Sequence, residues 1–179
     1  MLPYTLHNHS HNFSAWAASR AASVIGCRFT VKQGKALLES IGLGPNLDSP
    51  AKIPEADKLD PIHRKWRQQI INQAQILDIP ITHGVAAKLI NVYLKSRFVC
   101  GGFAEYPKVQ ALHPPIDSLL LQKLARRDFG GKAKLWSNAY KARWSKFDSE
   151  TYEKVIQEIR KSLDGEPMWK IERFWSGHQ

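Results

Sequence analysis

The sequence predicts an all-α protein, a compact single-domain helical bundle, and three observations lead to this prediction. The chain has 179 residues, 43% of them hydrophobic and 23% charged, a composition typical of one globular domain. Apolar residues recur at helical spacing in successive segments, and capping residues, glycines or prolines bound these segments. The sequence contains no pattern of a strand hairpin, repeat or low-complexity tract. Disordered, collagen-like and mini-protein classes are therefore excluded.

Residues 1–12 are expected to form a flexible tail ahead of the helical domain, residues 13–179. The tail carries three histidines at alternate positions, His7, His9 and His11. Alternating histidines can hold a metal ion, but no carboxylate or cysteine stands beside these three. We therefore interpret them as part of a polar tail, and we assign no metal and no cofactor.

The first two helices are indicated by periodicity and by capping residues. An Ala-rich helix is expected over residues 13–24, closely packed because its side chains are small. Its helically spaced residues are Phe13, Trp16, Ala17 and Ala21, with Arg20 on the exposed side. Thr30 and Gln33 form a capping box that starts a second helix over residues 31–41. Residues 43–60 contain three prolines and are expected to be a loop.

Two further helices are expected in the middle of the chain. Asp60 followed by Pro61 is typical of an N-cap with proline in the first turn of a third helix. The apolar stripe of this helix consists of Ile62, Trp66, Ile70 and Leu77. After a break around Pro80, a fourth helical region is expected over residues 82–98, followed by a second loop over residues 100–114.

The last four helices are predicted from their caps and stops. They are expected over residues 117–129, 132–144, 149–163 and 168–175. Asp117 opens the first of them, Asp148 or Ser149 caps the third, and Pro167 starts the last.

Charge and cysteine content restrict the partners and the compartment. The 26 Lys and Arg residues against 16 Asp and Glu give a net charge of +10. Such an excess favours a polyanionic partner, because each neutralised phosphate releases a counterion, and nucleic acid becomes the leading partner class. The two cysteines, Cys27 and Cys100, are too few for a disulfide framework, an iron–sulfur cluster or a Cys-based zinc site. With no signal peptide and no apolar span, we expect a cytoplasmic monomer with no membrane partner.

The expected fourth helix carries an unusual lysine. Apolar residues cover most of its circumference: Ala86, Ala87, Leu89, Ile90, Tyr93, Leu94 and Phe98. The gap holds Lys88, Asn91 and Lys95. One interpretation is a solvated stripe, or a Lys88 that pairs with a carboxylate. The other is a nucleophilic amine, because partial burial and the positive end of the helix both favour the neutral form of Lys88.

Asp117 is the second candidate for chemistry. It follows His113 and two prolines, which force an extended entry into the next helix. Its carboxylate is expected to stay ionised at the helix start. By itself this pattern favours an ordinary N-cap.

Together the two fragments resemble the signature of the helix-hairpin-helix (HhH-GPD) DNA glycosylase superfamily, over roughly residues 80–129. The matching runs are Gly84, Val85, Ala86, Ala87 and Lys88, and then Pro115, Ile116 and Asp117 with the helix through Phe129. In that family a glycine-rich hairpin leads into a helix with the catalytic lysine, and a proline-containing approach delivers the catalytic aspartate. The long connection is similar to that of the archaeal 8-oxoguanine DNA glycosylases. His83 and Ala86 stand where the family has a proline and a second glycine.

The resemblance implies a DNA glycosylase that flips out and excises a modified base. Asp117 would stabilise positive charge on the sugar, and Lys88 would attack C1′. The resulting Schiff base permits β-elimination, which would add AP-lyase activity; if Lys88 only positions a phosphate, activated water would remove the base instead. The expected target is an oxidised purine or a hypermodified phage base, such as glucosylated hydroxymethylcytosine in anti-phage defence.

Further residues are candidates for contacts with DNA and with the base. Residues 121–146 hold eight Lys and Arg against one Asp, which is typical either of a phosphate-binding surface or of an ordinary solvated face. The candidate DNA contacts are His83, Gly84, Lys95, Arg126, Arg127, Lys132 and Lys134. The candidate base-pocket residues are Asn91, His113, Trp136 and Trp144, although core packing is the alternative role of any tryptophan.

Two other function classes are open. A catalytically silent helical protein could bind nucleic acid through the same basic surface, and it would tolerate alanine at Lys88 and Asp117 with its affinity intact. A helical adaptor would owe its charge to solubility, and raising the salt concentration would scarcely affect its interactions.

Overall fold

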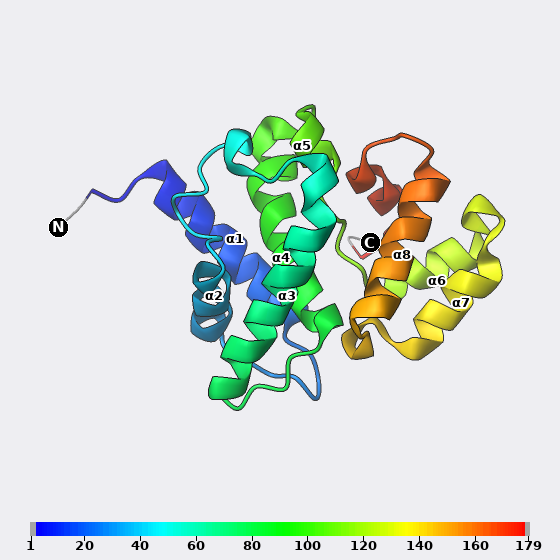
Figure 1. The fold of residues 1–179 in the computed structure, drawn as a ribbon, viewed down its shortest axis with the longest axis horizontal. Helices are drawn as coiled ribbons and strands as arrows, with labels where there is room; N and C mark the ends of the chain where they lie inside the picture. Colours follow the sequence, from blue (N-terminus) through cyan, green and yellow to red (C-terminus); the bar gives the residue numbers. More distant parts are fainter. Residues whose placement is uncertain (1–2, 178–179) are drawn as a thin grey trace.

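The computed structural model describes residues 3–177, and its helices form two groups that lie side by side (Figure 1). The first group consists of α1 (Leu6–Ala22), α2 (Val31–Ser40), α3 (Leu59–Ile76), α4 (His83–Leu94) and α5 (Pro107–Gln110). The second consists of α6 (Ser118–Arg126), α7 (Ala133–Ala142) and α8 (Ser149–Leu163). A π-helical segment, η3 (Lys95–Phe103), continues α4. Short 3₁₀ helices are η1 (Pro50–Lys52), η2 (Ala56–Lys58), η4 (Phe129–Gly131), η5 (Trp144–Lys146) and η6 (Met168–Phe174).

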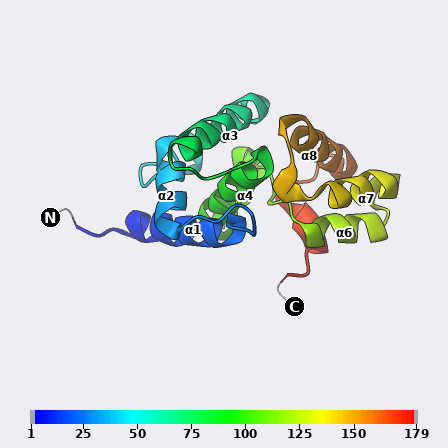
Figure 2. The same cartoon turned by 90° about the horizontal axis from the view of Figure 1, so that it is seen from below.

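The prediction of an all-α fold is confirmed. Between residues 3 and 177 the only β-type pairing is one isolated bridge, between Val24 and Cys27. Seen from below, the C-terminal segment lies beside α6 (Figure 2), and η6 packs on α6 and α8.

Each group of helices has its own hydrophobic core, and α4 contributes to both. Leu89 and Ile90 belong to the core of the first group, whereas their neighbour Ala87 belongs to the core of the second. Trp144 packs against both cores. Helix α4 is therefore the wall that the two halves share, as its apolar circumference predicts.

The first helix begins earlier than predicted and buries a different face. Thr5 caps α1 through a capping box with Asn8, so residues 6–12 are helical and the prediction of a flexible tail over residues 1–12 is wrong for them. The buried face carries small residues, Ser14, Ala15, Ala18, Ser19 and Ala22. Phe13 and Trp16 lie on the exposed side, where their rings are in contact, and Arg20 is exposed as expected.

Helix α3 starts at Leu59, not at the predicted cap Asp60. The preceding residue, Lys58, makes no side-chain cap bond, because η2 leads directly into the helix. The buried face of α3 includes His63 and Arg67, which lie beside the predicted apolar stripe, whereas Leu77, a predicted member of that stripe, is 42% exposed. The carboxylate of Asp60 instead accepts hydrogen bonds from His113 and Arg160.

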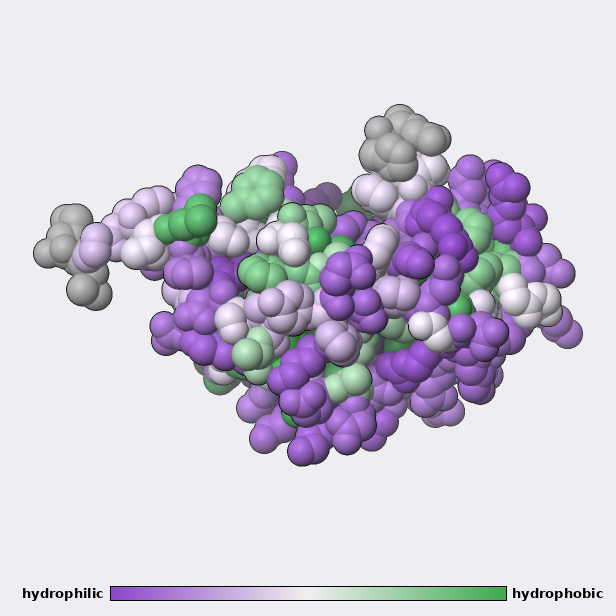
Figure 3. Space-filling view, turned by 90° about the horizontal axis from the view of Figure 1, so that it is seen from above, coloured by the Kyte–Doolittle hydropathy of each residue, from purple (hydrophilic) through white to green (hydrophobic). Residues whose placement is uncertain are grey.

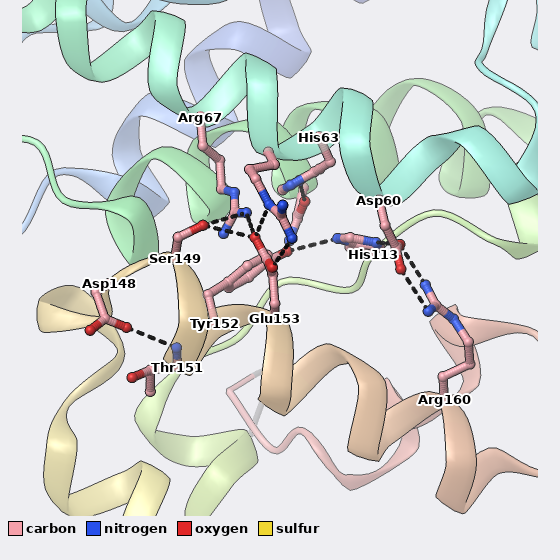
Figure 4. A network of polar contacts seen from close by, with 12 residues as sticks. Asp60, His63, Arg67, His113, Asp148, Ser149, Thr151, Tyr152, Glu153 and Arg160 are labelled. Atoms are coloured by element: carbon pink, nitrogen blue, oxygen red, sulfur yellow. Dashed lines mark hydrogen bonds and ion pairs between the residues drawn. The ribbon is translucent and has the colours of Figure 1, made fainter.

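A network of polar contacts joins α3 to α8 (Figure 4). One part runs from the Asp60–Arg160 ion pair through His113 to the Tyr152 hydroxyl. A second part lies at Glu153, whose carboxylate accepts hydrogen bonds from Arg64, Arg67 and Ser149. In several of these pairs the two partners are more than 80 residues apart in the sequence. The network therefore fixes one half of the molecule against the other.

The second predicted loop, residues 100–114, is partly helical. Helix α4 continues directly into the wider π-helical segment η3 at Lys95. The π-helical segment ends near Gly102, whose φ of 90° only glycine adopts easily. After α5 and a turn at residues 111–112, residues 113–117 form the extended connection that the prolines predict.

The turn after α7 packs directly on the N-terminus of α4. Thr82 caps α4 and also donates its hydroxyl to the carbonyl of Ser145, and the amide of Gly84 donates to the carbonyl of Phe147. A Cβ atom on Gly84 would collide with the carbonyl oxygen of Trp144. Gly84 is thus required for the close approach of two backbones.

Hydrophilic side chains cover most of the face shown in Figure 3, with apolar side chains between them. Within residues 3–177, no helix combines the length and the apolar character needed to cross a membrane.

Candidate active site

Lys88 and Asp117 meet at the boundary between the two halves. Asp117 caps α6 with one carboxylate oxygen, Oδ1, which accepts a hydrogen bond from the amide of Leu120 at 2.9 Å. The other oxygen, Oδ2, lies 2.9 Å from Nζ of Lys88. The residue is therefore both the predicted N-cap and the partner of the lysine, because its two oxygens serve different groups.

Both groups are largely removed from solvent, with 8% of the Lys88 side chain and 18% of the Asp117 side chain exposed. Burial lowers the pKa of Lys88, and the neighbouring Asp117 carboxylate only partly offsets this effect. The Lys88 ammonium also lies 5.3 Å from the centre of the Trp144 ring. A buried amine with a lowered pKa has more of the neutral form that can act as a nucleophile.

The C-terminal segment adds two residues that the sequence did not suggest. The indole Nε1–H of Trp175 donates a hydrogen bond to Oδ2 of Asp117, at 2.9 Å. Glu172 contacts Lys95, whose ammonium lies 5.5 Å from the centre of the Trp175 ring. Burial raises the pKa of Glu172, and the contact with Lys95 works against this rise. Neither residue stands in a motif, so only the fold reveals them.

These groups surround one cavity of about 300 Å³, at the lower end of the range of small-molecule sites, about 300–1,000 Å³. Its polar lining residues are Lys88, Lys95, Ser96, Cys100, Asp117 and Glu172. Its apolar lining residues are Phe13, Ala17, Ala21, Val92, Pro115 and Trp175. Three members of the predicted stripe in residues 13–21, Phe13, Ala17 and Ala21, thus line the cavity rather than the core, whereas Trp16 does not line it.

Three of the four predicted base-pocket residues lie elsewhere. Trp136 is fully buried in the second core, where its indole donates to the carbonyl of Phe129. Asn91 and His113 are buried in the polar network, and both bind the hydroxyl of Tyr152. None of them lines the cavity at Lys88. Trp144 lies nearest to the site, because the centre of its ring is 5.3 Å from the Lys88 amine, but it does not line the cavity either.

The predicted hairpin contacts are not open to a ligand. The amide of Gly84 is occupied by the carbonyl of Phe147, and Gly84 is buried. His83 is half-buried, and burial is the main cause that lowers its pKa. A hairpin that held a phosphate with the Gly84 amide would need the turn at Phe147 to move, so this expectation is wrong for the structure as it stands.

The basic residues of the second half are spread over different surfaces. Arg126 and Arg127 are exposed at the C-terminal end of α6, whereas Asp117 caps its N-terminal end. Lys132 pairs with Glu158, and it lines, together with Lys134, a larger cavity of about 620 Å³ between α7 and α8.

Arg143 and Lys146 are exposed and flank Trp144, and η5, which contains Trp144 and Lys146, packs on α4. Among the described residues, no carboxylate lies within ion-pair distance of either cation. The sequence shows that the stretch is basic, and the fold places these two cations beside the tryptophan whose ring lies near Lys88.

The three N-terminal histidines separate in the fold. His11 is buried and hydrogen-bonded to the Tyr93 hydroxyl and to Glu39, whereas His7 and His9 are exposed. Residues 3–177 contain no cluster of three or more His, Cys, Asp or Glu side chains that could hold a metal ion.

Comparison of the chain with protein-family models, curated proteins and solved structures finds no match.

Proposed function

We propose that the protein is a DNA glycosylase that excises a modified base, with Lys88 and Asp117 as its catalytic residues. The observation that supports this most directly is the 2.9 Å contact between the Lys88 amine and the Asp117 carboxylate at the wall of one cavity. An amine and a carboxylate are the two groups that cleavage of an N-glycosidic bond and capture of the sugar require.

The carboxylate acts first in this mechanism. When the N-glycosidic bond breaks, its electron pair leaves with the base, which takes up a proton, and positive charge develops on the sugar. Asp117 faces this charge from a fixed position, because the amide of Leu120 and the indole of Trp175 hold its two oxygens. Preorganised charge of this kind, away from water, stabilises the transition state by several kcal/mol.

The amine acts second. Neutral Lys88 attacks C1′ and forms a carbon–nitrogen bond. A proton then moves from the nitrogen to O4′ as the C1′–O4′ bond breaks, which gives a protonated Schiff base. Removal of a proton from C2′ then expels the 3′ phosphate by β-elimination, so the enzyme is a glycosylase and an AP lyase. Because burial lowers the pKa of Lys88, forming the neutral amine that this route requires costs less free energy than it would in water.

The substrate is DNA, and the target base leaves the stack to enter the cavity. The flat ring of Phe13 and the ring of Trp175 line it. The net charge of +10 and the exposed Arg143 and Lys146 near Trp144 supply contacts for the phosphates. Unpaired thiols at Cys27 and Cys100 fit a reducing compartment such as the cytoplasm.

The test is incubation with duplexes that each carry one modified base, including 8-oxoguanine and glucosylated hydroxymethylcytosine. We expect wild type to release a base from at least one duplex, which heat and alkali reveal as a strand break. Sodium borohydride should trap a covalent complex with wild type and not with Lys88→Gln.

A non-catalytic nucleic-acid-binding protein is the second candidate, because the basic surface alone would support it. Under that function, no duplex loses a base, and Lys88→Gln and Asp117→Asn bind DNA as wild type does. Absence of base release from the whole panel, with tight and salt-sensitive binding, would replace the glycosylase proposal with this one.

A further inference from the structure

Two lysine–carboxylate pairs lie along one side of the cavity. Lys88 and Lys95 are seven residues apart on the continuous helix of α4 and η3, which separates their backbones by about 10 Å. Asp117 from α6 meets the first lysine and Glu172 from η6 meets the second. Trp175 connects the pairs, since its indole nitrogen binds Asp117 and its ring lies beside Lys95.

The proposed cleavage of the glycosidic bond and capture of the sugar use only Lys88 and Asp117. If the sugar is held at Lys88, the base extends from C1′ along the cavity toward Lys95 and Glu172. Only one carboxylate oxygen of Glu172, Oε2, contacts Lys95, and no described residue donates to the other. The Lys95 ammonium has three N–H donors, and Glu172 is its one hydrogen-bond acceptor among the described residues. Each group therefore keeps hydrogen-bonding capacity toward the cavity.

We infer that Lys95 and Glu172 select the base by its polar edge, an inference that rests on the proposed function. Lys95 donates to an exocyclic oxygen, and Glu172 accepts from the adjacent ring N–H. This donor and acceptor pair matches a lactam edge, in which a carbonyl stands beside a ring N–H, as in guanine-type and uracil-type bases.

Bases with an amidine edge are disfavoured for a physical reason. Adenine-type and cytosine-type bases present an amino group beside a ring nitrogen that accepts, so Lys95 would face a donor and Glu172 would face an acceptor. Leaving both charged groups unpaired in a buried site is costly. A base with an attached hexose also needs more room than a cavity of about 300 Å³ with largely apolar walls provides.

The experiment compares matched bases that differ in this edge. Single-turnover excision is measured on duplexes with 8-oxoguanine or 8-oxoadenine, and with 5-hydroxyuracil or 5-hydroxycytosine, each opposite a non-pairing partner so that extrusion costs are similar. We expect wild type to excise the lactam member of a pair faster by about ten- to a hundredfold. Glu172→Gln, whose amide can donate or accept, should reduce this ratio at least about fivefold.

Controls separate selection from general damage. Glu150→Gln changes a carboxylate in the other, larger cavity and should leave the ratio unchanged. Should circular dichroism show that Glu172→Gln is unfolded, Lys95→Gln removes the charged donor and should lower the same ratio.

Failure of base selection by Lys95 and Glu172 can be distinguished from failure of the proposed glycosylase function. If wild type releases no base from any duplex, the proposed function fails and this inference falls with it. If wild type releases bases without preferring the lactam edge, or if the folded variants lower both rates by the same factor, the inference is overturned and the glycosylase proposal stands.

Discussion

Trp175 donates its indole N–H to Asp117, on the same carboxylate oxygen that binds Lys88. The two residues are 58 positions apart, and the contact closes the C-terminal segment over the candidate site. The carboxylate is thereby held by three donors: the amide of Leu120, the lysine ammonium and the indole. Its orientation is set before any ligand arrives, which is the condition for electrostatic stabilisation of a transition state.

Trp175→Phe tests this positioning role. The variant keeps a ring beside Lys95 but removes the donor to Asp117, and we expect excision to slow by about ten- to a hundredfold, the value of one hydrogen bond to a charged group. Trp136→Phe is the matched control, because it loses a buried hydrogen bond to Phe129 and should lower the melting temperature with little change in rate. Equal rates for wild type and Trp175→Phe would contradict the role.

Asp117→Asn and Asp117→Ala separate the two functions of this residue. Asparagine still caps α6, whereas alanine removes the cap, so only the alanine variant should lose about 1 kcal/mol of unfolding free energy. Both should reduce excision by at least about a hundredfold, because both remove the charge. Urea denaturation and single-turnover assays measure the two effects. Full activity of the folded Asn variant would show that the charge is unnecessary.

Gly84→Ala is expected to destabilise the protein by at least about 1–3 kcal/mol, the range for overpacking. The added methyl group would meet the backbone of Trp144, which cannot retreat without breaking the contact between Gly84 and Phe147. Gly44→Ala is the control, since its nearest neighbour is an ordinary 3.9 Å contact with Glu39. Similar urea midpoints for the two variants would indicate that the η5 turn can shift to accommodate the methyl group without loss of stability.

The network at Glu153 predicts a pH-dependent contribution to stability. Burial alone would raise the pKa of Glu153, but hydrogen bonds from Arg64, Ser149 and Arg67 lower it to about 2 in the folded state. The unfolded value is near 4.5, so the stabilisation is fully present above that pH and is lost as the pH falls through about 2.

Glu153→Gln should therefore cost roughly 1–3 kcal/mol at pH 7, the range for a hydrogen bond to a charged group, and much less near pH 2. Urea denaturation of both proteins across this pH interval measures the difference. A gap between them that stays constant down to pH 2 would contradict the depressed pKa.

Lys146→Gln tests the position of the DNA-binding surface. A plot of log affinity against log salt concentration has a negative slope. If Lys146 contacts a phosphate, the variant should reduce the magnitude of this slope by about 1. Lys161→Gln is the control, because Lys161 is paired with Glu158 on α8. Fluorescence anisotropy with one unmodified duplex measures both, and a larger effect of the control would place the DNA-binding surface at α8 instead.

Most helices could be predicted from the sequence, because amphipathic helices show a regular spacing of apolar residues and recognisable capping residues. Helices α2 and α8 begin at the predicted caps, Thr30 and Asp148. Helix α3 shows the limit of this reasoning. Its buried face carries His63 and Arg67, which the predicted apolar stripe leaves out because the pattern cannot show that α8 brings a carboxylate and a phenol to them.

The candidate site was accessible in part for a similar reason. Lys88 stood out as a cation on an apolar helix, and Asp117 followed two prolines at a helix start. Glu172 and Trp175 carry no such local signal, since their importance comes only from the contacts of the C-terminal segment with Lys95 and Asp117. Trp136 shows the converse, because its place in a basic stretch predicts a base-pocket residue whereas its side chain is in the core.

Cys100 lies exposed in the wall of the cavity, whereas Cys27, the only other cysteine of the chain, is 5% exposed. A maleimide-linked fluorophore would therefore attach selectively at the mouth of the candidate site in the unmutated protein. Such a label turns cavity occupancy into an optical signal, so entry of a nucleotide could be timed by stopped flow separately from any bond breakage.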